Sequence, residues 1–183
     1  APGAGKGTQA ERLAGQVSIP PLSTGEMLRQ AKAQGTSVGR LAAEYIDAGL
    51  LVPDEVIVDL VAERLAEPDC AVGCLFDGFP RTVAQAEALD RQLSSRGMPI
   101  DAVFYLDVPE DRLVERLLAR GRDDDTRETI EQRFHEYQRQ THPLLEFYTG
   151  LGLLRPINGI GSRDEVFERI LSAVDKIGVD ATS

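Results

Sequence analysis

The chain opens with APGAGKGTQA, in which glycines, a lysine and a threonine are spaced as in a phosphate-binding loop of the Walker A type. Glycines let consecutive backbone N–H groups turn toward one phosphate, and a helix that starts at such a loop adds the partial positive charge of its N-terminus. We expect the phosphate contacts to come from Gly3, Ala4, Gly5, Lys6, Gly7 and Thr8. The first glycine of the pattern would precede Ala1, and Gly7 separates Lys6 from Thr8, unlike the usual Lys-Ser/Thr form.

An aspartate at the end of a short apolar run offers the second half of such a site. The run CLFD ends at Asp77 and is typical of a buried strand. A carboxylate in that position would orient Mg²⁺, through a bound water, beside the phosphates. By itself an aspartate at a strand end is equally typical of a turn, so the Mg²⁺ interpretation depends on the phosphate-binding loop.

The overall charge argues against a nucleic-acid partner. The 183 residues include 20 basic and 30 acidic side chains, a net charge of −10, so there is no general basic field to hold duplex DNA. A small anionic ligand remains compatible with this charge. No apolar run approaches the ~18 residues that a membrane span requires, and 42% hydrophobic residues suit one folded domain. We therefore expect neither nucleic acid nor membrane as a partner.

The two cysteines, Cys70 and Cys74, are too few for a disulfide scaffold or for a zinc site built from four thiolates. We interpret them as thiols of the core. Free core thiols are typical of a reducing compartment, so we expect a cytoplasmic protein.

The hydrophobic pattern predicts an α/β fold with a parallel sheet, because apolar runs that end in Gly or Asp alternate with amphipathic segments. Strands are expected over 73–77, 102–108 and 153–157. Helices are expected over 5–14, 54–66, 82–96, 109–120, 126–148 and 162–176, with two short ones between 23 and 52. A glycine-rich loop that opens a helix ordinarily follows a buried strand, so a further strand is expected upstream of Ala1.

Three more motifs make the chain similar to adenylate kinases: STGEMLR at 23–29, DGFPRTVAQA at 77–86 and RGRDDD at 120–125. The resemblance extends over essentially the whole chain, apart from the upstream strand. It implies a three-layer P-loop nucleoside-triphosphatase fold, with a parallel central sheet and helices on both faces. It also implies a core of residues 1–22, 53–119 and 127–183, an insertion at 23–52 that binds a nucleoside monophosphate, and a short lid at 120–126.

The activity implied by this resemblance is reversible phosphoryl transfer from Mg-ATP to AMP, which gives two ADP. A phosphate acceptor is already ionised at pH 7, so the reaction requires no base. What it requires is neutralisation of two polyanions and exclusion of water, which arginines on separate elements can supply. The two histidines, His135 and His142, have no accompanying Ser or Cys motif.

On the AMP side, the resemblance places Thr24 near the base, Arg29 and Arg81 on the phosphate, and Gln85 at the adenine edge. The complete AMP-binding set that it implies is Thr24, Arg29, Leu50, Leu51, Val52, Gly78, Phe79, Pro80, Arg81, Gln85, Arg122 and Arg133. Residues 50–52 would line the adenine through their backbone, and Gly78 would let the chain pass close to the nucleotide.

On the ATP side, Arg120 would contact ATP and Gly161 would let the backbone approach the donor adenine. Arg122 and Arg133 would bridge the phosphates being exchanged. The implied catalytic set is Lys6, Arg81, Arg120, Arg122 and Arg133. Asp124 and Asp125 would hold these arginines when the lid closes. The lid segment has no Cys or His, so no structural zinc is expected.

Three alternatives remain open. A uridylate or cytidylate kinase shares the fold and the arginines, although Thr24 and the stretch TVAQ favour AMP. A nucleotide-operated switch would ordinarily carry the guanine-reading Asn-Lys-x-Asp motif, which this sequence lacks. A non-catalytic remnant is suggested only by the missing upstream strand. We expect a monomer, because two flaps that close over substrates must move freely.

Overall fold

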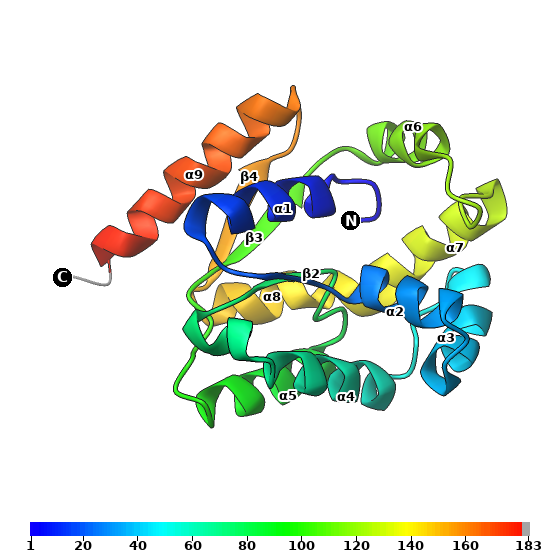
Figure 1. Cartoon of the computed structure of the whole chain (residues 1–183). Helices are drawn as coiled ribbons and strands as arrows, with labels where there is room; N and C mark the ends of the chain where they lie inside the picture. Colours follow the sequence, from blue (N-terminus) through cyan, green and yellow to red (C-terminus); the bar gives the residue numbers. More distant parts are fainter. Residues whose placement is uncertain (181–183) are drawn as a thin grey trace.

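The computed structural model describes residues 1–180, which alternate between helices and short strands (Figure 1). The elements are α1 (Lys6–Val17), β1 (Pro21–Ser23), α2 (Thr24–Ala33), α3 (Ser37–Asp47), α4 (Asp54–Leu65), the 3₁₀ turn η1 (Pro68–Val72), β2 (Leu75–Asp77), α5 (Val83–Ser94), β3 (Val103–Asp107), α6 (Glu110–Arg120), α7 (Arg127–Glu136), the π-helical turn η2 (Tyr137–Thr141), α8 (Pro143–Gly150), β4 (Leu154–Asn158) and α9 (Arg163–Asp180). Each of the three expected strands corresponds to one of these elements.

The described strands form two parallel pairs. In one pair β1 lies beside β2, so that Ser23 is opposite Asp77; in the other β3 lies beside β4, so that Asp107 is opposite Asn158. The predicted parallel direction is confirmed, and within residues 1–180 β2 and β3 are not hydrogen-bonded neighbours. The strand expected upstream of Ala1 stays a prediction.

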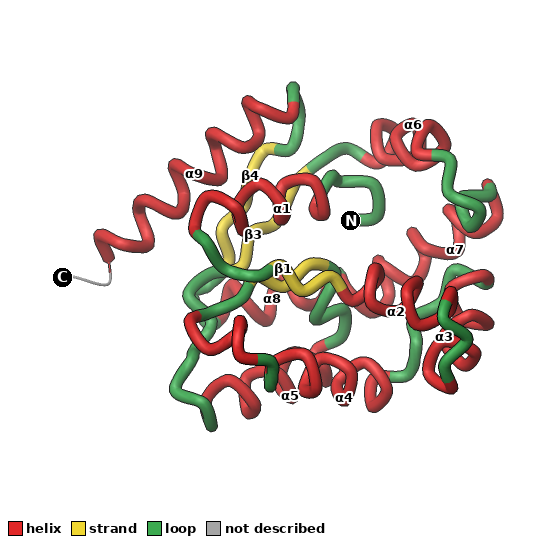
Figure 2. Tube along the Cα trace, in the orientation of Figure 1, coloured by secondary structure: helices red, strands yellow, loops and turns green. Residues whose placement is uncertain are grey.

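Helices cover both faces of the strands, which confirms the layered α/β architecture (Figures 1 and 2). On one side α1 packs against α9, against β1 and against β2, and α9 also contacts β4. On the other side α5 lies between α4 and α8, and α8 contacts β4. None of the helices within residues 1–180 combines the length and apolarity that crossing a membrane requires.

Apolar side chains at helical spacing form two main cores. The first gathers around β3 and β4, where Leu113 and Leu117 of α6 are almost fully buried with Ile157. The second gathers around β1 and β2 and includes Leu22 and Leu89. Deep burial of an apolar side chain contributes about 1.5–3 kcal/mol, so these cores hold the strand ends in place.

Threonine caps explain where three helices begin. The hydroxyls of Thr36, Thr82 and Thr126 each accept a hydrogen bond from the backbone N–H three residues later, at 3.0, 3.1 and 3.2 Å. Such a cap satisfies one of the four free N–H groups at a helix start and contributes about 1 kcal/mol. These caps set the first residues of α3, α5 and α7.

One sequence expectation was wrong and one strand was missed. The continuous helix expected over 126–148 is interrupted after Glu136, where α7 gives way to η2, and α8 then begins at Pro143. Proline has no N–H to donate and its ring collides with the carbonyl one turn earlier, so the wider π-helical turn accommodates it. The strand β1 was not expected, because three residues next to Pro20 are too short to show an alternating pattern.

Candidate active site

The first loop turns through two glycines with left-handed backbone angles, Gly3 at φ 79° and Gly5 at φ 93°. Side chains rarely adopt such angles, and a Cβ on Gly3 would lie 2.8 Å from the carbonyl oxygen of Leu113 in α6. Gly5 is the cap of α1, so the N–H groups of the first helical turn have no acceptor within the helix. They are free to bind an anion, as the sequence predicts.

Lys6 projects from the first turn of α1 and keeps an exposed surface. Its ammonium donates to the carbonyl oxygen of Ala1 at 2.8 Å. Its pKa is lowered to about 8, first by loss of hydration where protein surrounds the amine and then by Arg81 and Arg120, with Asp77 acting in the opposite direction. The three charges that act on Lys6 are all predicted site residues, so the geometry brings the loop, the end of β2 and the lid segment together.

Asp77 lies against the first turn of α1. A Cβ on Gly7 would be 3.4 Å from Asp77 Oδ2, and the same oxygen accepts a hydrogen bond of 3.1 Å from the hydroxyl of Ser23. A single carboxylate beside a phosphate loop suits Mg²⁺, which keeps several waters and takes phosphate oxygens as its other ligands. No cluster of three or more ligating side chains was found among residues 1–180.

Positive side chains from separate elements gather in front of the loop. Burial lowers the pKa of Arg81, with Asp77 opposing and with Arg133 and Arg29 adding to the decrease. Burial also lowers the pKa of Arg122, and Arg29 and Arg120 lower it further. Like charges act on each other in this way only at short range, so α2, the segment 80–82 between β2 and α5, the lid segment and α7 all face one site.

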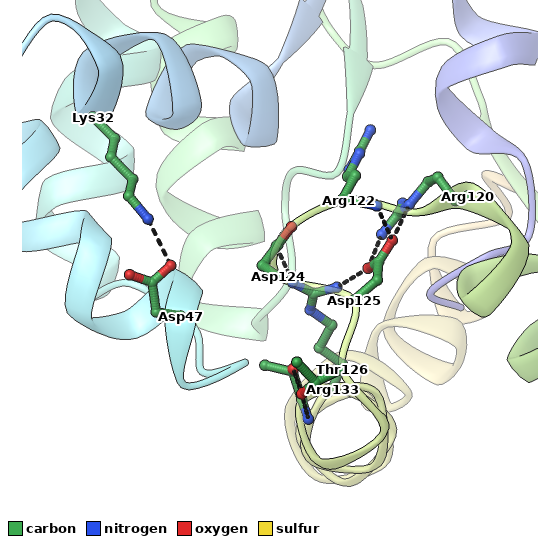
Figure 3. Close-up of polar contacts among 9 residues, drawn as sticks. Lys32, Asp47, Arg120, Arg122, Asp124, Asp125, Thr126 and Arg133 are labelled. Carbon is green, nitrogen blue, oxygen red and sulfur yellow. Dashed lines mark hydrogen bonds and ion pairs between the residues drawn. The ribbon is translucent and has the colours of Figure 1, made fainter.

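Acidic residues of the lid segment hold two of these arginines (Figure 3). Arg120 donates to both oxygens of Asp125, at 2.8 and 2.6 Å, and Arg133 donates to Asp125 at 2.8 Å and also pairs with Asp124. The side chain of Asp125 is 1% exposed. These contacts agree with the expectation for Arg120 and Arg133. Arg122 differs, because only its backbone N–H contacts Asp125, at 3.3 Å, while its guanidinium points away.

A shared carbonyl connects two predicted AMP residues. The oxygen of Gly78 accepts from Thr24 Oγ1 at 3.0 Å and from Arg81 Nε at 2.8 Å. Gly78 has φ 72°, and a Cβ there would be 3.1 Å from a guanidinium nitrogen of Arg81. Arg29 lies nearby along α2, 3.2 Å from where a Cβ on Gly25 would be. The motif glycine is therefore required both by its backbone angle and by the closeness of Arg81.

Gln85 is buried, at 2% exposure, and both ends of its amide are bonded. Its Nε2 donates to Asp54 Oδ1 at 2.7 Å, and its Oε1 accepts from the backbone N–H of Arg81 at 2.7 Å. The second oxygen of Asp54 accepts from the hydroxyl of Thr82 at 2.9 Å. Sequence reasoning did not single out Asp54, which after Pro53 is typical of a helix start, and it also left out Ser23 beside Asp77.

The remaining predicted residues lie around this site in different ways. Val52 and Phe79 have side chains buried in the core, so only their backbone could contact a nucleotide, whereas Leu50 is exposed. Leu51 and Pro80 are partly exposed. Gly161 lies in the turn between β4 and α9 at φ 122°, 2.8 Å from Glu165 when a Cβ is placed on it. Within residues 1–180, the side chains nearest to a Cβ placed on Gly161 are those of Glu165 and Arg169, neither of which belongs to the predicted site.

A family model described as Adenylate kinase matches residues 1–153, which include every predicted site residue except Gly161. An adenylate kinase of Leptospira biflexa serovar Patoc is 50% identical over 177 residues, covering 94% of this chain and 95% of the relative. The adenylate kinase of Bacteroides thetaiotaomicron is 45% identical over 181 residues, with 97% and 96% covered. That of Thermodesulfovibrio yellowstonii is 44% identical over 207 aligned positions, with 96% of each chain covered.

Proposed function

The chain belongs to the adenylate kinase family, and from this premise we propose that it transfers the terminal phosphoryl group of Mg-ATP to AMP, reversibly, giving two ADP. The observation that carries the proposal is the convergence of Lys6, Arg81, Arg120 and Arg122 in front of the first loop. Burial lowers the pKa of Lys6 and of Arg122, Arg81 and Arg120 lower that of Lys6 further, and Arg120 lowers that of Arg122 further. A site in which the positive side chains outnumber the carboxylates that pair with them suits a triphosphate and a monophosphate placed end to end.

In this reaction the protein positions and neutralises its substrates and moves no proton. The backbone N–H groups at the start of α1 and the ammonium of Lys6 hold the donor phosphates. Arg29 and Arg81 hold the acceptor phosphate from the opposite side. Arg120, Arg122 and Arg133 offset the charge that spreads over the phosphoryl oxygens as the bond breaks.

Mg²⁺ would neutralise the donor phosphates and keep their oxygens oriented. Asp77 would hold the ion through water, since one carboxylate already bonded to Ser23 offers few direct ligands. The acceptor needs no deprotonation, so the site has no need of a general base.

Two parts of the chain are proposed to move against a core of residues 1–22, 53–119 and 127–183. The insertion at 23–52 contains two packed helices, α2 and α3. An ion pair of 2.6 Å between Lys32, in the last turn of α2, and Asp47, the last residue of α3, joins them (Figure 3). The lid at 120–126 is a short turn closed on itself by Asp125. Closure of both parts would exclude water, which would otherwise accept the phosphoryl group.

The finer assignments are also proposals. AMP rather than UMP or CMP is supported by Thr24 and Gln85 in the acceptor segment and by the names of the relatives. A cytoplasmic location is supported by the free thiols of Cys70 and Cys74. A monomer that binds ATP, AMP and ADP is the simplest assembly compatible with two moving flaps. The family's role in balancing adenine nucleotides would follow from the reaction.

The test supplies Mg-ATP as donor and AMP, UMP, CMP and GMP separately as acceptors, while formation of ADP is followed. We expect selective turnover with AMP. Preference for UMP or CMP would leave the fold and the chemistry standing but overturn the acceptor assignment. Absence of turnover with all four acceptors, in protein that unfolds cooperatively, would overturn the enzymatic function itself.

A further inference from the structure

A closed ring of hydrogen bonds joins the first residue of α4 to the start of α5. Asp54 accepts from Gln85 Nε2 through one oxygen and from Thr82 Oγ1 through the other, at 2.7 and 2.9 Å. Thr82 in turn accepts from the backbone N–H of Gln85 at 3.1 Å. The fourth bond runs from the backbone N–H of Arg81 to Gln85 Oε1, at 2.7 Å.

The chemistry of its partners fixes which way the Gln85 amide faces. A carboxylate such as that of Asp54 only accepts hydrogen bonds, so the NH₂ end of the amide must lie there. The backbone N–H of Arg81 only donates, so the carbonyl end must lie opposite. Gln85 is 2% exposed, which leaves solvent little access to the amide. If the amide turned over, its NH₂ group would face the N–H of Arg81 and its carbonyl oxygen would face the carboxylate of Asp54. Neither pair can form a hydrogen bond, and each unpaired group would cost about 1–3 kcal/mol.

The amide keeps one donor and one acceptor for a ligand, in a fixed order. Its second N–H and its second carbonyl lone pair remain after the bonds to Asp54 and Arg81. Adenine presents an acceptor at N1 beside a donor at N6, whereas hypoxanthine presents a donor at N1 beside an acceptor at O6. The two bases therefore require opposite orders, and an amide that cannot turn over distinguishes them.

We propose that Asp54 is a specificity-determining positioning residue that fixes the orientation of the Gln85 amide and so selects adenine over hypoxanthine at the acceptor site. This inference rests on the proposed function, since it takes AMP as acceptor and Gln85 as the residue that meets its base. Asp54 acts through Gln85 and touches no substrate itself. Its second link, to Thr82, ties the same carboxylate to the cap of α5 and keeps it from rotating away.

The experiment compares kcat/KM for AMP and for IMP, with Mg-ATP as donor. Asp54→Asn keeps the size of the side chain but offers both a donor and an acceptor, so that position 54 no longer opposes the reversed amide and only the Arg81 N–H still does. We expect the AMP-to-IMP ratio of kcat/KM to fall about tenfold, with most of the change in KM. The matched control is Glu55→Gln, which removes the same charge from the same turn of α4 at an exposed position and should leave the ratio unchanged.

A double-mutant cycle separates positioning from general stability. In Gln85→Met protein the base-reading amide is gone, so adding Asp54→Asn should change the AMP-to-IMP ratio no further. A second fall of the ratio in that background would overturn a role that acts through Gln85. Should Asp54→Asn fail to unfold cooperatively, Asp54→Ser carries the same test, because its hydroxyl both donates and accepts and is well tolerated at a helix start, and a ratio unchanged in that variant would overturn the proposal.

Failure of this inference is distinguishable from failure of the proposed function. Wild-type protein that prefers AMP, together with an unchanged AMP-to-IMP ratio in Asp54→Asn, would overturn the role of Asp54 alone. Wild-type protein that prefers UMP or CMP would overturn both.

Discussion

The positive residues of the site are held in two different ways. Arg120 and Arg133 are paired in advance with Asp125, whose side chain is 1% exposed, so their guanidinium groups are oriented before substrate arrives. Burial lowers the pKa of Lys6 and of Arg81, Asp77 opposes the decrease, and the other cations that these two residues face add to it. Unpaired like charges of this kind destabilise the site until a polyanion neutralises them, so phosphate binding relieves a repulsion built into the fold.

Replacing Lys6 tests this interpretation of the unpaired charges. Lys6→Met should lower kcat about 10²–10³-fold, because one donor of transition-state charge stabilisation is lost. Its free energy of unfolding should not fall, since the repulsion by Arg81 and Arg120 is removed with it. The measurements are the steady-state rate with AMP and urea unfolding. Lys176→Met on α9 makes the same change at an exposed position and serves as control; near-normal turnover in Lys6→Met would refute the phosphate-loop assignment.

The paired arginines predict a dependence of stability on pH. Burial alone would raise the pKa of Asp125, but hydrogen bonds and charges from Arg120 and Arg133 and the N–H of Arg122 outweigh it, so the net direction is downward from 3.8. The ionised form is thus favoured on folding. This contribution is fully present above the unfolded-state pKa and is lost as the pH falls through the lower folded-state value.

We expect Asp125→Asn to lower the free energy of unfolding by about 1–3 kcal/mol at pH 7, since two arginines lose their shared acceptor. The difference between wild type and Asp125→Asn should shrink as the pH falls below 3.8, the ordinary value for this carboxyl. Urea unfolding of both proteins at neutral and acid pH gives the measurement. Asp123→Asn, in the same turn but exposed, is the control. A difference that stays constant with pH would mean that the ion pairs contribute no net stability.

At the scale of elements, the packing of α2 against α3 depends on one glycine. Gly39 lies in the first turn of α3, and a Cβ there would overlap the backbone carbonyl of Ala31 in α2. Backbone cannot move aside as a flexible side chain can, so Gly39→Ala should separate the helices and cost about 1–3 kcal/mol. Because α2 carries Arg29, the KM for AMP should rise more than the KM for ATP.

Gly15 in α1 provides a control of opposite sign. No atom lies within 4 Å of a Cβ placed on Gly15, so Gly15→Ala should stabilise the protein by about 0.5–1 kcal/mol through higher helix propensity. Thermal unfolding and the two KM values of both variants give the test. Equal stability changes in Gly39→Ala and Gly15→Ala would show that the interface between α2 and α3 is not close-packed.

Local signals explain why much of this arrangement could be predicted from the sequence. The phosphate loop, the start of a helix near Thr126 and the strand ending at Asp77 each show in consecutive residues. The role of Asp54 could not be predicted in the same way, because its partners Thr82 and Gln85 are 28 and 31 residues away and meet it only through tertiary packing.

At the scale of the whole molecule, repulsion between its parts predicts that substrate closes it. Arg29 on the insertion and Arg122 in the lid segment are close enough that Arg29 lowers the pKa of Arg122, so the two parts repel each other across the site. A dinucleotide that joins two adenosines through five phosphates would neutralise both. We expect it to reduce the radius of gyration in solution scattering and to raise the melting temperature, whereas adenosine, which lacks phosphate, should do neither. The compaction should weaken in Arg122→Ala, and a raised melting temperature with an unchanged scattering profile would show that the ligand binds a site that is already closed.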